Sequence, residues 1–279
     1  MSAIIDQAAI KSSADEDGFV EPAERKIPKF VLTLISVFVA LVLWEIAGRR
    51  VNPIFASYPS AIAVAFWELA RTGALWSATY DSLRPFVLGY GIAILIGAPL
   101  GLLLGRYAVF EALFGIYVTA GFAMPLVALV PLLTLWLGLG FAVKVTIIFL
   151  MSVFPICINT WLGVRAVPKS LIEVGRALVA PNAVILRRIV FPATLPYIVA
   201  GMKLAIGRAV VAMIIAEFFT AISGLGAIII NSANNFDTAT MFVPIVVLVV
   251  LAIGLTSFIG FVERKLAPWQ AEIAGRNEA

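Results

Sequence analysis

The sequence predicts an all-α integral membrane protein with about six transmembrane helices, and three observations support this fold class. Hydrophobic residues make up 62% of the 279 residues and charged residues only 13%, whereas about a quarter of the residues in a soluble domain are charged. The mean hydropathy is +1.05. Apolar runs of roughly 20 residues, long enough to cross a hydrocarbon core about 30 Å thick, recur along the chain.

Six apolar segments predict the spanning helices in chain order. We expect these helices at about residues 30–47, 85–104, 110–137, 141–160, 197–222 and 241–262. Pro125 and Pro131 lie within the third segment, where they predict a kink or a break because proline lacks the N–H that a helix interior needs. Between the first two spans, residues 61–71 form an amphipathic piece that can lie along the membrane surface.

The second span carries small residues at every fourth position, so they share one face of the helix. This stripe consists of Gly89, Ala93, Gly97, Gly101 and Gly105. Small residues at this spacing let two helix backbones approach closely in lipid, which predicts a helix-packing face.

The distribution of Lys and Arg predicts the orientation of the chain. With the N-terminus inside, the inner segments hold thirteen of these residues and the outer loops only four. Positive charge concentrates on the cytoplasmic side of membrane proteins. We therefore expect a cytoplasmic N-terminal tail over residues 1–28, the first helix and an extracytoplasmic connection over 29–78, and a cytoplasmic C-terminal tail over 264–279.

Several classes of function are excluded by what the sequence lacks. Histidine is absent and Cys157 is the only cysteine, so no internal disulfide, no Cys/His metal site and no imidazole or thiol catalyst is expected. There is no G-x-x-x-x-G-K-[ST] phosphate loop and no G-x-S-x-G elbow. The formal charge of +4 reflects loop orientation rather than affinity for nucleic acid. The chain is thus expected to need no cofactor, to be no enzyme, and to transport a solute with energy from a partner or an ion gradient.

The predicted spans contain few ionisable side chains, namely Lys144, Lys203, Arg208 and Glu217. Lys203 can reach the inner interface. Nine residues separate Arg208 from Glu217, which places them on opposite faces of one helix and prevents their pairing. Each therefore pairs with another helix or faces a wet cavity. Arg208 and Glu217 are accordingly candidates for the translocation path.

The inner loop over residues 161–195 is patterned as two short helices. Pro168 precedes the first, and Pro181, a favoured first helical residue, opens the second. Pro192 and Pro196 are expected to end the second helix before the next span. Two such helices would form a compact surface for another protein.

This loop resembles the signature loop of the permease subunits of bacterial ABC importers. The signature reads E-A-A, three residues, G, nine residues, I-x-L-P, and Glu173, Ile189 and Pro192 match it. The departures are Val174 and Gly175 for the two alanines, Val179 for the glycine and Phe191 for the leucine. The segments "FPICINTWLGVRAVP", "LPYIVAGMKLAIGRA", "AEFFTAISGLGAII", "FDTATMFVPIVVL" and "ERKLAPWQ" are similar to permeases of the nitrate/sulfonate/taurine type.

The resemblance implies a type I ABC importer permease fold over residues 79–263 in the bacterial inner membrane. It also implies a homodimeric path, two ATPase subunits beneath it and an extracytoplasmic solute-binding protein. The solute would be a sulfonate-, taurine- or nitrate-like anion, or a pyrimidine or vitamin precursor. The residues expected to couple to the ATPase are Glu173, Gly175, Arg176, Leu178, Val179, Ile189, Pro192 and Pro196.

Two other classes of function would leave different patterns in the sequence. A secondary carrier or channel would show inverted repeats and acidic groups at the membrane midplane. A membrane enzyme, such as a lipid-modifying transferase, would carry clustered His, Asp or Ser near an interface. Neither pattern is found in the sequence.

Overall fold

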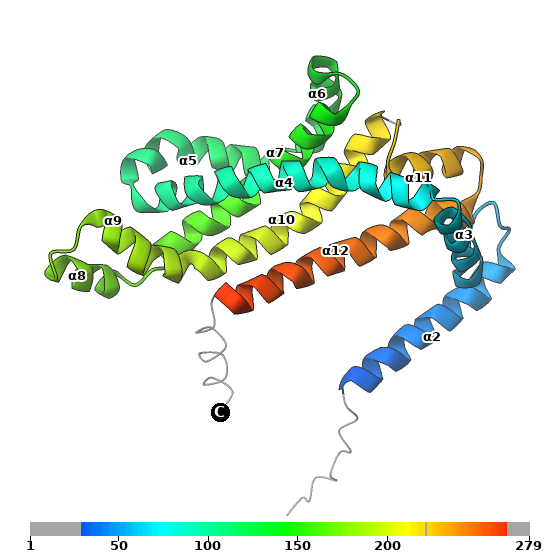
Figure 1. Ribbon diagram of the computed structural model, residues 1–279, viewed down its shortest axis with the longest axis horizontal. Helices are drawn as coiled ribbons and strands as arrows, with labels where there is room; N and C mark the ends of the chain where they lie inside the picture. Colours follow the sequence, from blue (N-terminus) through cyan, green and yellow to red (C-terminus); the bar gives the residue numbers. More distant parts are fainter. Residues whose placement is uncertain (1–28, 221, 267–279) are drawn as a thin grey trace, which may run out of the picture. The chain divides into compact units, whose positions relative to one another are not determined.

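The computed structural model describes residues 29–220 and 222–266, and the expectations for the two terminal tails lie largely outside these residues (Figure 1). Every regular element in the described residues is helical. The chain divides into two compact units, residues 1–46 and 47–279. The first unit contains most of α2 (Lys29–Arg50), whose apolar side chains are almost all exposed, as lipid-facing side chains are.

Five helices in the described residues are long and apolar enough to cross a membrane. In addition to α2 they are α4 (Ala74–Arg106), α7 (Phe141–Arg165), the apolar run Asn182–Thr220, and α12 (Thr238–Leu266). A sixth span results if α5 (Ala108–Ala123) and the segment Leu126–Leu137 count as one. The expectation of about six helices in an all-α membrane protein is thereby confirmed.

The break expected in the third span lies at Pro125. α5 ends at Ala123, and after it come a 3-10 turn, η1 (Leu126–Leu129), and α6 (Val130–Leu137). The two halves are bent by 88°. Met124 has an extended backbone with ψ 137°, as expected for a residue that precedes proline.

The glycine stripe of α4 packs against α7. A Cβ on Gly89 would lie 2.7 Å from the Val145 carbonyl oxygen, and one on Gly97 would lie 2.8 Å from that of Val153. Any side chain in place of these two glycines would therefore push the two helices apart. α7 also packs against α10 (Phe191–Thr220), and Ile147, Ile156 and Ile206 belong to the shared apolar core.

The connection between the first two spans is more helical than expected. The amphipathic piece forms α3 (Pro59–Arg71), which buries Ile62. α4 then begins at Ala74, so Pro85 lies inside the helix and does not begin it. A short apolar helix, α11 (Leu225–Asn234), lies between the fifth and sixth predicted spans, where no helix is expected from the sequence.

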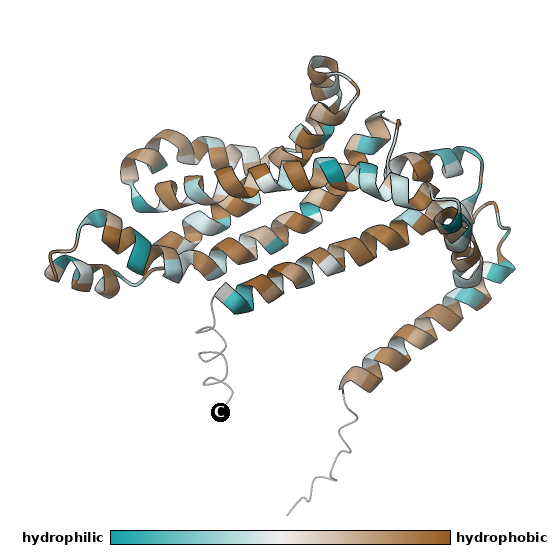
Figure 2. Ribbon diagram, in the orientation of Figure 1, coloured by the Kyte–Doolittle hydropathy of each residue, from teal (hydrophilic) through white to brown (hydrophobic). Residues whose placement is uncertain are grey.

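The expectation that Pro192 and Pro196 end the second loop helix is wrong. α9 (Asn182–Ile185), the π-helical turn η2 (Leu186–Val190) and α10 form one continuous helical run of 39 residues. Proline clashes with the carbonyl four residues earlier in a regular α-helix. The wider π-turn immediately before Pro192 relieves this conflict, because its hydrogen bonds join residues five apart. Figure 2 shows the apolar character of α10 and α12 along most of their length.

Candidate functional site

The helix that carries the signature glutamate is α8 (Lys169–Ala177), which begins after Pro168 as expected. It ends in a Schellman motif. The Ala180 N–H donates to the Gly175 carbonyl at 3.0 Å, and the Val179 N–H donates to the Arg176 carbonyl at 2.9 Å. The residue after the cap in this motif adopts the left-handed conformation and is usually glycine. Val179 occupies that position with φ +55°.

One face of α8 is fixed to the long helical run. Gly175 is buried, and a Cβ there would lie 3.1 Å from side-chain atoms of both Ile185 and Ile189. Ile185 and Val190 belong to a small apolar core that also includes Val164 from the end of α7. Gly175 and Ile189 therefore hold α8 in place from the inside, and the signature isoleucine lies away from the free surface of the loop.

The opposite face of α8 is exposed. It continues into the Schellman motif after α8, where Leu178 is 76% exposed and Val179 87% exposed at the tip of the segment. The charged side chains of Glu173 and Arg176 are also exposed beside them. Pro192 and Pro196 lie within the long helical run and do not belong to this face. α8 and α9 lie at one end of the helix bundle, and α11 lies at the other (Figure 1); we call the latter the distal end.

Arg208, on α10, is half-buried among apolar helices. Its guanidinium lies 4.4 Å from the centre of the Phe122 ring on α5, close to the break at Pro125. Among the described residues it has no carboxylate within ion-pair distance. Lys203, by contrast, forms an ion pair with Glu263 of α12 at 2.5 Å.

Glu217 has no exposed surface and lies in a polar cluster at the distal end. Its carboxylate accepts a hydrogen bond from the Ser82 hydroxyl at 2.7 Å and another from the Gly226 N–H at 2.7 Å. The ammonium of Lys144 on α7 lies 3.6 Å away and is itself buried. In this conformation Glu217 therefore lines no open path, because its partners on α4, α7 and α11 enclose it.

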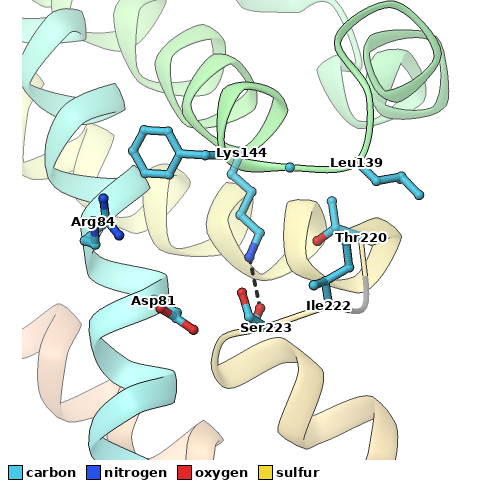
Figure 3. Close-up of a pocket in the computed structure, with 9 residues that line it drawn as sticks. Asp81, Arg84, Leu139, Lys144, Thr220, Ile222 and Ser223 are labelled. Atoms are coloured by element: carbon cyan, nitrogen blue, oxygen red, sulfur yellow. Dashed lines mark hydrogen bonds between the residues drawn. The ribbon is translucent and has the colours of Figure 1, made fainter.

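A pocket of about 220 Å³ lies beside this cluster (Figure 3). Lys144 reaches across it and donates a hydrogen bond to the Ser223 carbonyl at 2.9 Å. The lining residues are Asp81, Arg84, Leu139, Gly140, Phe141, Lys144, Thr220, Ile222 and Ser223. The sequence identified Lys144 and Glu217 as intramembrane charges, but it did not predict their pairing or the role of Ser82.

No group of three or more acidic, histidine or cysteine side chains in the described residues could hold a metal ion. The structure combines long apolar helices, few buried charges and a short helix, α8, with one fixed and one exposed face. This combination is typical of a membrane protein that transports a solute and contacts a partner. None of these features assembles a nucleophile with a base.

Comparison with known proteins also identifies a transport protein. Residues 93–268 match the family described as "Binding-protein-dependent transport system inner membrane component". The chain is 31% identical over 248 residues to SsuC of Bacillus subtilis (strain 168), named as an aliphatic sulfonates transport permease, across 87% of this chain and 88% of that one. It is also 31% identical over 259 residues to the riboflavin transport system permease RibX of Chloroflexus aurantiacus, across 90% and 96% of the two chains.

The fold is also similar to a solved importer. A chain of the MetNI methionine ABC transporter, in an inward-facing conformation, aligns with a TM-score of 0.55 and 20% identity over 72% of this chain and 96% of that one. Such a likeness supports the type I permease fold. Together with the sequence matches, it shows that the chain belongs to the family of binding-protein-dependent transport system inner membrane components, as a permease subunit of an ABC importer and not an enzyme.

Proposed function

We propose that this permease works as one of two identical copies, and that α8 of each copy docks on an ATPase subunit that drives uptake of a small organic anion. The observation that carries the proposal is the exposed face of α8, which stands free while the opposite face is fixed to the long helical run. The sequence has no phosphate loop, so the nucleotide site belongs to the partner.

The composition of this face suits a protein interface. Such interfaces combine an apolar centre with a polar rim. Leu178 and Val179 provide exposed apolar surface, and Glu173 and Arg176 provide charged groups around it. Because Gly175 is buried against the long run, a displacement of α8 by a docked ATPase would move that run as well.

Charge reversal at Glu173 tests the docking. Losing one partner of a charged hydrogen bond in a buried interface costs about 2–5 kcal/mol, so Glu173→Lys should detach or uncouple the ATPase while the permease still inserts. Glu68→Lys, which reverses an exposed glutamate on α3, serves as the matched control. Unchanged ATPase co-purification together with unchanged substrate-stimulated ATP hydrolysis in Glu173→Lys would refute the assigned role.

Arg208 supports the anionic class of substrate. It lies on the same helical stripe of α10 as the exposed residues Leu204 and Val211, and two copies that enclosed a path along this stripe would present two guanidiniums to it. Ionisable groups inside a membrane protein usually mark a pathway or an ion pair, and aliphatic sulfonates, which SsuC is named for, are anions. If the measured mass of the purified importer accounts for only one permease copy, a path enclosed by two copies is contradicted.

Removing the charge of Arg208 should slow transport without affecting assembly. We expect Arg208→Gln to lower the initial rate of sulfonate uptake by about tenfold, equivalent to about 1.4 kcal/mol, with normal membrane accumulation and ATPase co-purification. Arg208→Lys keeps the positive charge and should retain more of the rate. If Arg208→Gln fails to accumulate in the membrane, the side chain serves helix packing and the pathway role is lost.

A further inference from the structure

The polar cluster at the distal end holds residues 223–226, which lie just before and within the start of α11 and which we call the α10–α11 turn. Its hydrogen bonds converge on the backbone of that turn from three different helices. Ser82 on α4 accepts from the Leu225 N–H at 2.9 Å, Lys144 on α7 donates to the Ser223 carbonyl at 2.9 Å, and Glu217 on α10 accepts from the Gly226 N–H at 2.7 Å. Three helices, α4, α7 and α10, thus hold the turn by hydrogen bonds.

Two glycines let the carboxylate of Glu217 approach the turn. Gly224 has φ +104°, a conformation that L side chains rarely adopt. A Cβ on Gly224 would collide with both carboxylate oxygens of Glu217, and a Cβ on Gly226 would lie 2.7 Å from the Cβ of Glu217. The local sequence is therefore fitted to a carboxylate at this place, which accepts from a first-turn N–H of α11 that has no partner within its own helix.

Hydrogen bonds to water can replace the hydrogen bonds that hold the turn. Lys144 and Ser223, which bond to each other, both line the adjacent pocket of about 220 Å³, as does Thr220 at the end of α10. Figure 3 shows the Lys144 side chain reaching across this space to the turn. When the turn moves, water in the pocket can solvate the exposed ammonium and carbonyl. A contact between apolar side chains would have no such substitute.

α10 connects this cluster mechanically to the coupling segment. The continuous run Asn182–Thr220 has 39 residues, or roughly 60 Å at 1.5 Å per residue. One end packs against α8 through Ile185 and Ile189, and Glu217 lies three residues from the other end. A movement of α8 therefore reaches the carboxylate through a single helix.

We propose that Ser82, Lys144 and Glu217 form a latch that holds the α10–α11 turn closed against α4 and α7, and that movement of α10 opens it during transport. The latch rests on the proposed function, because the docked ATPase supplies the movement. Glu217 is thus a positioning residue, and it need not contact the solute.

Paired charge removal distinguishes a latch from a purely structural cluster. Glu217→Gln or Lys144→Met alone leaves one buried charge without its partner and should reduce membrane accumulation. The double variant removes both charges, and its glutamine can still accept from the Gly226 N–H. If the cluster is only structural, the double variant should recover both accumulation and transport; if it is a latch, accumulation should recover while transport remains at least fivefold below wild type.

Cysteine accessibility measures the opening directly in the full permease. Thr220→Cys places a thiol in the pocket, and the buried native Cys157 gives the background rate. We expect the double variant to raise the rate of maleimide labelling at position 220 at least fivefold, and Ser82→Ala, which buries no unpaired charge, to raise it about twofold. Equal labelling rates in wild type, the double variant and Ser82→Ala would overturn the latch.

Adding ATP to the assembled importer separates the two proposals. We expect ATP to raise the labelling of position 220 in the wild-type background, as movement at α8 opens the turn. If no ATPase binds the permease, the docking proposal fails, while the labelling of the isolated permease still tests the latch. If ATPase binds and hydrolyses ATP but labelling does not change, the docking stands and the latch is contradicted.

Discussion

Val179 adopts a backbone conformation that a β-branched residue rarely takes. Its φ of +55° places it at the left-handed position of the Schellman motif that ends α8. The signature loop of the family has glycine at this position, and the motif explains why, since glycine alone adopts this conformation without steric cost. The side chain is retained at the tip of the exposed face, where it adds apolar surface at the expense of local strain.

Replacing Val179 by glycine should relieve this strain. A left-handed conformation costs an L residue about 1–2 kcal/mol, and the greater freedom of glycine in the unfolded chain offsets part of the gain. We expect Val179→Gly to slow hydrogen exchange of the Ala180 amide, which closes the motif. Val179→Ala is the control because it removes the side chain but keeps the strain. Faster exchange in Val179→Gly than in Val179→Ala would contradict the assignment of strain.

At this scale the sequence identifies the unusual residues but not their partners. Charges inside apolar segments are visible by composition, so Lys144, Arg208 and Glu217 could be singled out. The pairing of Lys144 with Glu217 spans 73 residues of chain and depends on how α7 and α10 pack. Ser82 has no such signal, because it is uncharged and lies in a polar stretch before the second predicted span.

The packing face of α4 could be predicted from the sequence. Small residues at every fourth position lie on one face, and the structure places α7 against that face. The continuity of α9, η2 and α10 could not be predicted in the same way. Pro192 and Pro196 each oppose a regular helix, and only the π-turn before Pro192 reconciles them with a continuous run. α11 escaped prediction because a ten-residue apolar helix is too short to span.

A pair of glycines on α4 tests the packing of the two helices. A Cβ on Gly97 would lie 2.8 Å from the Val153 carbonyl oxygen and 3.2 Å from the Ile156 Cβ, whereas one on Gly91 would meet nothing within 4 Å. Overpacking costs typically about 1–3 kcal/mol, so Gly97→Ala should lower the thermal unfolding midpoint of the purified permease. Gly91→Ala should leave it unchanged or raise it, since alanine favours a helix. Equal midpoints for the two variants would show that α4 and α7 are not in close contact.

For the whole molecule, composition, charge distribution and one loop signature carry most of what the sequence predicts. The all-α class, the number of spans and the family follow from long apolar runs and from a loop signature that survives several substitutions. The proposed orientation follows from the excess of Lys and Arg on the side that includes α8. It places α8 where a cytoplasmic ATPase can reach it, and it places α11 on the opposite side of the membrane.

Site-directed cross-linking in cells that contain the assembled importer shows directly whether the tip of α8 contacts a cytoplasmic ATPase. Leu178→Cys places a thiol on the exposed face, and Asn234→Cys places one at the exposed end of α11. We expect Cys at 178 to capture the ATPase through a thiol-to-amine cross-linker and to resist a membrane-impermeant maleimide in intact cells. Cys at 234 should not capture the ATPase and should react with the maleimide in intact cells. Capture of the ATPase from position 234, or labelling of position 178 from outside, would show that α8 does not dock on a cytoplasmic ATPase.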